Sequence, residues 1–142
     1  MKSTIKYYLK SKKIPIDEFI ANALYDKNYG YYSKKTSFGK YGDFVTAPEI
    51  SFLFSEMLAL WVVSMWKHLK KPKKFNIVEL GPGSGRMNLT LIKVFKNFPD
   101  FFNSTNIFLY EKSESLKKLQ KKNLLNEKVK WIKNFNNIKS GP

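Results

Sequence analysis

The glycine-rich segment Gly81-Pro82-Gly83-Ser84-Gly85 constrains the fold of this chain more than any other feature of its sequence. It follows the apolar run at 75–80 directly and precedes residues with helical apolar spacing. Glycines at every second position allow a sharp turn from strand to helix, and they let a ligand approach the peptide groups. Amides at such a turn favour a polar or anionic ligand group. We therefore predict a strand–loop–helix unit that binds a ligand at its loop.

The residues around this loop predict an alternating α/β pattern. Apolar, strand-like runs lie at 75–80, 106–110 and 129–132, and helical spacing covers 88–98 and 113–123. Pro99 closes the first of these helices, and Leu116 and Leu119 are expected to face inward in the second. Strand, helix, strand, helix, strand is the beginning of a parallel, doubly wound sheet.

The N-terminal half predicts two helices. The first covers 14–26, with an apolar face at i, i+3, i+4 spacing, and paired tyrosines at 31 and 32 that we interpret as packing. The second runs from about Ala47 to His68, because Thr46, Pro48 and Glu49 form a capping-box pattern. A wide apolar face predicts that this second helix is well buried; it comprises Ile50, Leu53, Phe54, Met57, Leu58, Trp61, Val62 and Met65. The lysine- and proline-rich stretch at 70–74 predicts a boundary between a helical segment, 1–70, and a sheet domain, 71–142.

Two acids identify the expected ligand. A dinucleotide loop reads G-x-G-x-x-G, whereas this chain reads G-x-G-x-G with Glu79 two residues before the first glycine. A carboxylate there repels a pyrophosphate but attracts the sulfonium and ammonium of S-adenosylmethionine (SAM). Glu111 ends the second strand, where a carboxylate can hold ribose hydroxyls. SAM is therefore the predicted cofactor; a nicotinamide site, or a plain turn flanked by two solvated glutamates, stays open.

Composition narrows the possible partners. The net charge is +15, but Arg86 is the one arginine and the lysines are spread along the chain, so we expect no nucleic-acid partner. The sequence has no cysteine, which excludes disulfides and thiolate-bound metal, and no metal site is expected. Its apolar runs are too interrupted for a membrane span, and no secretory leader is evident at the N-terminus. A soluble cytoplasmic protein is the expectation.

The segment before the loop resembles one known family. Gly30-Tyr31-Tyr32, Phe38-Gly39 and the run G-D-F-V-T-A-P-E-I-S at 42–51, followed by Glu79-Leu80-Gly81-Pro82-Gly83, are similar to the family of the mitochondrial complex I assembly factor that methylates a protein arginine, and to its bacterial relatives. The resemblance covers about 14–142. It implies a class I SAM-methyltransferase fold (Rossmann-like) with an N-terminal helical addition. It further implies a protein substrate, a subunit of respiratory complex I, and a mitochondrial location in a eukaryote.

The family's chains continue well beyond Pro142, with a fourth strand that lies beside the first. The resemblance therefore implies an N-terminal fragment that holds the first three strands only. From this we expect an unpaired edge on 75–80, marginal stability, self-association and no methyl transfer by the fragment alone.

Two further acids are candidates for catalysis. A guanidinium nucleophile needs carboxylates to orient it and to accept its proton. Asp43 and Glu49 are the candidates, because the resemblance places their segment over the cofactor site. Glu49 as a capping partner and Asp43 as a turn residue stay open as structural alternatives. A methyltransferase of RNA or small molecules, a non-catalytic SAM-binding assembly factor and a nicotinamide-dependent oxidoreductase are the alternative functions.

Overall fold

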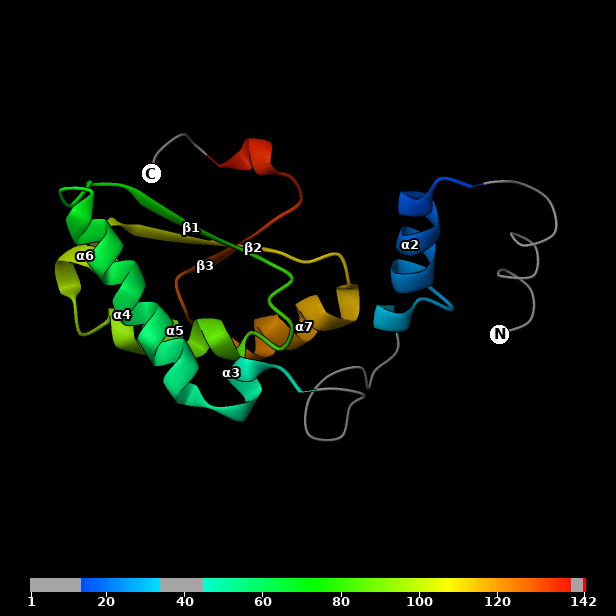
Figure 1. Ribbon diagram of the computed structural model, residues 1–142, viewed down its shortest axis with the longest axis horizontal. Helices are drawn as coiled ribbons and strands as arrows, with labels where there is room; N and C mark the ends of the chain where they lie inside the picture. The colour runs from blue at the N-terminus through cyan, green and yellow to red at the C-terminus, as the bar shows by residue number, and fades with distance from the viewer. Residues whose placement is uncertain (1–13, 34–44, 139–141) are drawn as a thin grey trace.

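A three-stranded parallel sheet forms the centre of the protein (Figure 1). The computed structural model describes residues 14–33, 45–138 and 142. Strands β1 (Phe75–Leu80), β2 (Thr105–Tyr110) and β3 (Val129–Ile132) lie in the order β1-β2-β3, with Ile77 opposite Ile107 and Leu109 opposite Trp131. The three strands predicted from the sequence are confirmed, and the second begins one residue earlier than predicted.

Helices cover one face of this sheet. Helix α5 (Arg86–Phe95) connects β1 to β2, and α7 (Glu114–Asn123) connects β2 to β3. Both predicted helices are confirmed, but α5 begins two residues before and ends three residues before the predicted range 88–98. A short helix that was not predicted, α6 (Pro99–Ser104), begins at the proline that ends the α5 region, because proline suits the first turn of a helix. In Figure 1, α4, α5 and α7 lie on the same side of the strands.

The hydrophobic core lies between the sheet and these helices. Ile107 and Leu109 of β2 pack against Ile92 and Phe95 of α5 and against Phe101 of α6. The ring centroids of Phe95 and Phe101 are 4.9 Å apart in an edge-to-face arrangement, which aromatic rings prefer. The short 3-10 helix η2 (Phe135–Asn137) lies on the other side of the strands from α4, α5 and α7 (Figure 1).

The predicted helix over 47–68 is two helices. Helix α3 (Ala47–Ile50) ends at Ser51, whose backbone is extended (φ −145°, ψ 129°), and α4 (Phe52–His68) begins immediately after it. The Ser51 hydroxyl accepts a hydrogen bond from the Leu53 amide at 3.2 Å and so caps α4. Thr46 forms no side-chain cap. A continuous helix was therefore the wrong prediction, since Ser51 is a favourable N-cap residue that starts a new helix.

The prediction that α4 is well buried is also wrong in this structure. Its buried side consists of Ser55, Ala59, Val63 and Trp66, which face α5 and the core. Six of the residues expected inside are exposed, namely Ile50, Leu53, Phe54, Met57, Trp61 and Met65. Apolar residues surround nearly the whole helix, and the small side chains of Ala59 and Val63 let one side approach α5 closely. Only that side is covered within the described residues.

The N-terminal residues form a separate small unit. Helix α2 (Ile16–Tyr25) is confirmed, and the 3-10 helix η1 (Tyr31–Ser33) follows it. Figure 1 shows α2 standing apart from the sheet, beside the start of α7. The rings of Tyr31 and Tyr32 lie 5.1 Å apart, as the packing interpretation predicted. Gly30 is required by space, because a Cβ there would lie 2.4 Å from the Asp26 amide nitrogen.

Pro142, at the end of the chain, bonds to the backbone of β1. The Asn76 amide donates to the Pro142 carbonyl at 2.8 Å. The division of the chain into 1–70 and 71–142 stays a prediction. In the described ranges, no helix has the length and apolar character needed to cross a membrane.

Candidate functional site

The loop between β1 and α5 has the conformation that its glycines allow. Gly81, Gly83 and Gly85 have φ values of +67°, +56° and +82°, a region that side-chain-bearing residues seldom occupy. A Cβ on Gly81 or Gly83 would meet no atom within 4 Å, whereas one on Gly85 would lie 3.2 Å from Leu124 Cδ1. The first two glycines therefore border open space, and the third is packed against α7.

Backbone hydrogen bonds hold this loop at the ends of the strands. The Gly81 amide donates to the Tyr110 carbonyl of β2 at 2.9 Å, and the Gly85 amide donates to the Pro82 carbonyl at 2.8 Å. The Ser84 hydroxyl accepts from the Arg86 amide at 3.4 Å, and Pro82 is buried. The loop is a closed turn, so its peptide groups have fixed directions before any ligand arrives.

Glu79 lies near the end of β1 with its side chain toward α5. The buried Asn88 amide donates from Nδ2 to Glu79 Oε2. Burial raises the pKa of Glu79 to about 7, and the hydrogen bond from Asn88 opposes part of that rise. Asn88 Oδ1 is buried and has no hydrogen-bond partner among the described residues. A cation near Glu79 would restore its charge, because it favours the ionised form.

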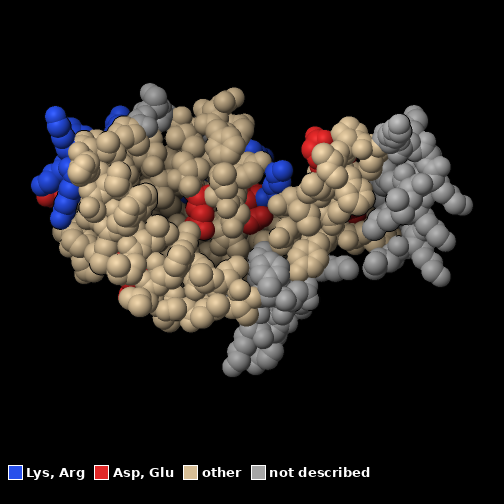
Figure 2. Space-filling model, viewed as in Figure 1, with Lys and Arg blue, Asp and Glu red and all other residues tan. Residues whose placement is uncertain are grey.

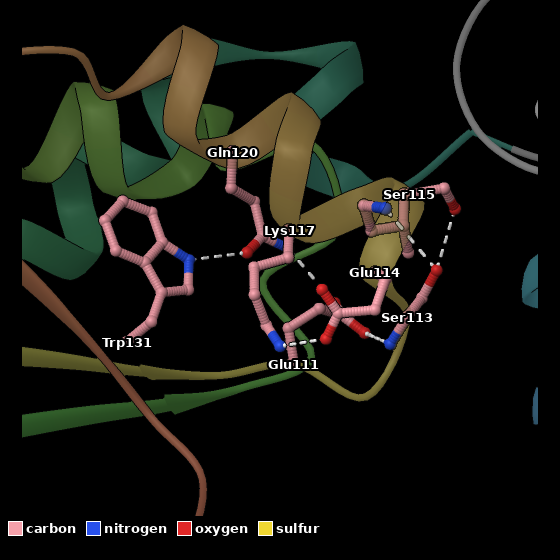
Figure 3. Close-up of polar contacts among 8 residues, drawn as sticks. Glu111, Ser113, Glu114, Ser115, Lys117, Gln120 and Trp131 are labelled. Atoms are coloured by element: carbon pink, nitrogen blue, oxygen red, sulfur yellow. Dashed lines mark hydrogen bonds and ion pairs between the residues drawn. The ribbon is translucent and has the colours of Figure 1, made fainter.

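Glu111 directly follows β2 and is held by two donors. Its Oε1 accepts from the Ser113 amide at 2.8 Å, and its Oε2 accepts from Gln120 Nε2 at 3.1 Å (Figure 3). The side chain is 8% exposed, so it is not a solvated surface glutamate. Each oxygen of a carboxylate can accept two hydrogen bonds, so Glu111 can still accept hydrogen bonds from further hydroxyl groups.

Gln120 of α7 is a site residue that sequence reasoning missed. The prediction that Leu116 and Leu119 both face inward is wrong for Leu119, which is 40% exposed, whereas Gln120 is fully buried. Leu116, Gln120 and Leu124 are spaced by four residues and define the inward side of α7. This four-residue spacing, considered without regard to polarity, would have identified Gln120 as an inward-facing residue.

The N-terminal unit lies beside Glu111. The Ser113 hydroxyl donates to the Tyr32 carbonyl at 2.8 Å, and Lys112 Nζ is 5.3 Å from the centre of the Tyr25 ring. Burial, and then the negative charge of Glu111, raise the pKa of Tyr25. Figure 2 shows acidic side chains where the sheet layer meets this unit, and most of the basic side chains in view at the opposite end.

The two acids predicted for catalysis are placed only in part. Asp43 lies outside the described residues, and so does the side chain of Glu49. The backbone of Glu49 belongs to α3, and α3 contacts α5, the helix that begins at the end of the glycine loop. The roles of Asp43 and Glu49 therefore stay predictions.

Comparison with known proteins connects this site to one kind of enzyme. Residues 57–142 match the profile of a family described as "Putative S-adenosyl-L-methionine-dependent methyltransferase". The chain is 38% identical over 118 residues to the protein arginine methyltransferase NDUFAF7 of Xenopus tropicalis, a match that covers 82% of this chain and 27% of that protein. It is 35% identical over 133 residues to the human NDUFAF7, which covers 92% and 30% of the two chains. Both relatives are named as mitochondrial proteins.

A solved structure shares the fold. A protein from Burkholderia thailandensis, crystallised with S-adenosyl-homocysteine (SAH), superimposes with a TM-score of 0.70 at 26% identity. The match covers 85% of this chain and 33% of that one. The chain thus spans about a third or less of the length of the proteins it matches.

Proposed function

The chain belongs to this family of SAM-dependent methyltransferases and has its Rossmann-like α/β fold, and from that premise we propose that it binds SAM at the glycine loop and serves the methylation of a protein arginine. One observation carries the proposal. Gly81 and Gly83 border open space at the edge of the sheet where the adjacent parallel strands β1 and β2 end, and these two ends carry Glu79 and Glu111. The crevice at the carboxyl ends of such strands is where open α/β sheets bind ligands.

The residues present fit this cofactor. The backbone of Gly81, Pro82, Gly83, Ser84 and Gly85 would line it, and a Cβ at the first or second glycine would fill the space. Glu111 offers acceptor lone pairs to the two ribose hydroxyls. Glu79, partly buried and short of hydrogen-bond donors, matches the positively charged end of SAM, because an added cation stabilises its ionised form.

Bound SAM would supply an electrophilic methyl group on its sulfonium. The chain's own residues have the task of holding it in line with a nucleophile, and such positioning supplies much of the rate enhancement in a displacement reaction. The closed glycine loop and the donor-held Glu111 suit this task, since both are fixed by hydrogen bonds within the protein.

The proposed substrate is a protein arginine in a respiratory complex I subunit. The names of the relatives support the protein arginine, and the resemblance of residues 42–51 to the complex I assembly-factor family supports the complex I subunit. Asp43 and Glu49 would orient the guanidinium and accept its proton. No nucleic-acid partner and no membrane insertion are proposed. The proposed location is the cytoplasm, or the mitochondrion in a eukaryote.

Calorimetry with SAH tests cofactor binding, and incubation with tritium-labelled SAM tests transfer. We expect saturable SAH binding and label in an arginine of a complex I subunit. Label in total RNA would instead identify a nucleic-acid methyltransferase, and binding without transfer to any protein would identify a non-catalytic binding protein. Asp43→Asn should lower transfer far more than SAH affinity, because a neutral amide cannot pair electrostatically with a guanidinium.

A further inference from the structure

Gln120 is the one polar side chain of α7 that is completely buried. Lys118, Lys121 and Lys122 of the same helix are exposed, and Leu116 and Asn123 are partly buried. An amide without hydrogen bonds is costly to bury, so such a group is retained only where its polar atoms have partners. Gln120 has three partners, and each belongs to a different part of the fold.

The partners of Gln120 are a loop carbonyl, a carboxylate and an indole. Its Nε2 donates to the Gly83 carbonyl at 2.9 Å and to Glu111 Oε2 at 3.1 Å. Its Oε1 accepts from Trp131 Nε1 of β3 at 2.9 Å (Figure 3). One side chain thus connects the glycine loop, the end of β2 and the third strand.

The indole determines which way the amide points. Trp131 Nε1 can only donate, so the oxygen of Gln120 must face it. The NH2 group is then directed at the other two partners, and both of its hydrogens are used. Because a carboxylate and a carbonyl can only accept, this arrangement of the three partners is the one that satisfies every group.

The contact at Gly83 also sets the direction of a loop peptide. The Gly83 carbonyl points toward α7, and in a trans peptide the amide of the next residue, Ser84, points the opposite way. Asn123, three residues after Gln120 on the same face of α7, donates to the Ser84 carbonyl at 2.9 Å. Two side chains of α7 therefore orient two successive peptides of the loop.

We propose that Gln120 is a positioning residue for the cofactor, which fixes the Glu111 carboxylate and the Gly83 peptide relative to each other, with Trp131 fixing Gln120 in turn. This inference rests on the proposed SAM binding. Gln120 itself need not touch the ligand: it acts through Glu111 and the loop, so that the ribose acceptor and the loop amides are correctly spaced before binding.

Calorimetry with SAH on the full chain tests this role. Gln120→Met keeps the length of the side chain and removes its polar atoms; we expect SAH affinity to fall about tenfold. Lys118→Met places the same side chain at an exposed position of α7 and should leave affinity unchanged. Trp131→Phe removes only the indole donor and the second ring, and should weaken SAH by a smaller factor. If Gln120→Met does not fold, Trp131→Phe tests the same role of Gln120.

A double-mutant cycle separates positioning from general stability. If Gln120 acts through Glu111, Gln120→Met should have a much smaller effect on SAH affinity when Glu111 is already alanine. A purely structural role would lower the melting temperature and leave the dissociation constant of the folded protein unchanged. Two results would overturn this inference and leave the proposed function standing. One is a wild-type chain that binds SAH and a Gln120→Met variant with the same dissociation constant. The other is strictly additive effects of Gln120→Met and Glu111→Ala on SAH affinity. Absence of SAH binding by the wild-type chain overturns the proposed function and this inference together.

Discussion

The ends of β1 and β2 each carry a glutamate on the helix side of the sheet, but the two carboxylates differ in the hydrogen-bond donors around them. Glu111 receives hydrogen bonds from a backbone amide and from a fully buried side-chain amide. In the part of the chain that the structure describes, Glu79 receives one from Asn88, and burial raises the pKa of Glu79 to about 7. A donor-rich setting makes a carboxylate a fixed acceptor, whereas a donor-poor one makes its charge depend on what binds beside it.

This difference corresponds to the two ends of the proposed ligand. Ribose hydroxyls need an acceptor whose position is constant, and Glu111 would provide it. The sulfonium and ammonium need a negative charge, and a cation bound beside Glu79 would favour its ionised form. The glycine loop follows Glu79 in the chain, and Gln120 bonds both to this loop and to Glu111.

Replacing the middle of that loop should have the largest effect. Gly83→Val forces a β-branched residue into φ +56° and fills the open space, so SAH binding should be abolished. Calorimetry measures the affinity, and circular dichroism confirms the fold. Gly85→Ala is the contrasting variant: its Cβ meets Leu124, so it should mainly lower the melting temperature. SAH affinity of Gly83→Val equal to that of the wild type would remove the loop from the site.

Removing the fixed acceptor should have the next largest effect. Glu111→Ala deletes the proposed hydrogen bonds to the ribose, which costs about 1.5–3 kcal/mol of SAH binding free energy, or about 10- to 150-fold in affinity. Stability should also fall, because the Ser113 amide and Gln120 lose a partner. Glu114→Ala, an exposed glutamate paired with Lys117, is the control and should bind normally. A folded Glu111→Ala variant with the wild-type dissociation constant would contradict the ribose role.

The charge-sensitive end predicts a pH dependence. Because the folded pKa of Glu79 is raised from 4.5 to about 7, the folded state holds a proton that the unfolded state releases. This contribution to stability is present below about pH 4.5 and is lost as pH rises to about 7, by at most about 3 kcal/mol. Urea unfolding of the ligand-free protein between pH 5 and pH 8 should show that loss. Glu79→Gln should lack it, and identical pH profiles of the two proteins would count against the buried, donor-poor setting.

The smallest effect should come from the partner of Glu79. Asn88→Leu removes the hydrogen bond that lowers the pKa of Glu79, so the carboxyl should be more often neutral at pH 7. Compared with the wild type, the variant should then lose SAM affinity severalfold at pH 7 and less at pH 8. Asn97→Leu, at the exposed end of the α5 region, is the matched control. A constant ratio of affinities across this pH range would show that Asn88 does not tune Glu79.

Local signals predicted the part of the fold that faces this site. The glycine loop and the apolar runs of β1, β2 and β3 follow from short-range sequence patterns, and each is placed as expected or within one residue. The polar partners were not predictable in the same way. Asn88 and Gln120 look like ordinary helix residues, and their roles come from packing against strands more than eight residues away in sequence.

Helix α4 shows the opposite case: its apolar pattern was identified correctly, but the burial predicted from that pattern was wrong. Its apolar residues were identified, but hydrophobicity does not say which side of an apolar helix meets a neighbour. The side that packs is the one with small residues, Ala59 and Val63, beside Trp66. The break at Ser51 has a similar origin, since serine fits both a helix interior and a cap, and the structure uses it as a cap.

The hydrogen bond between Trp131 and Gln120 has an optical consequence. The three indoles of the chain differ in setting: Trp61 is 60% exposed, Trp66 donates to the Pro72 carbonyl, and Trp131 is linked through Gln120 to Glu111 and the glycine loop. Indole emission responds to the polarity and hydrogen bonding of its surroundings. The proposed binding of a ligand at Glu111 would therefore be coupled to a fluorophore of the protein itself. With Trp61 replaced by phenylalanine, intrinsic fluorescence would report that event without any added label.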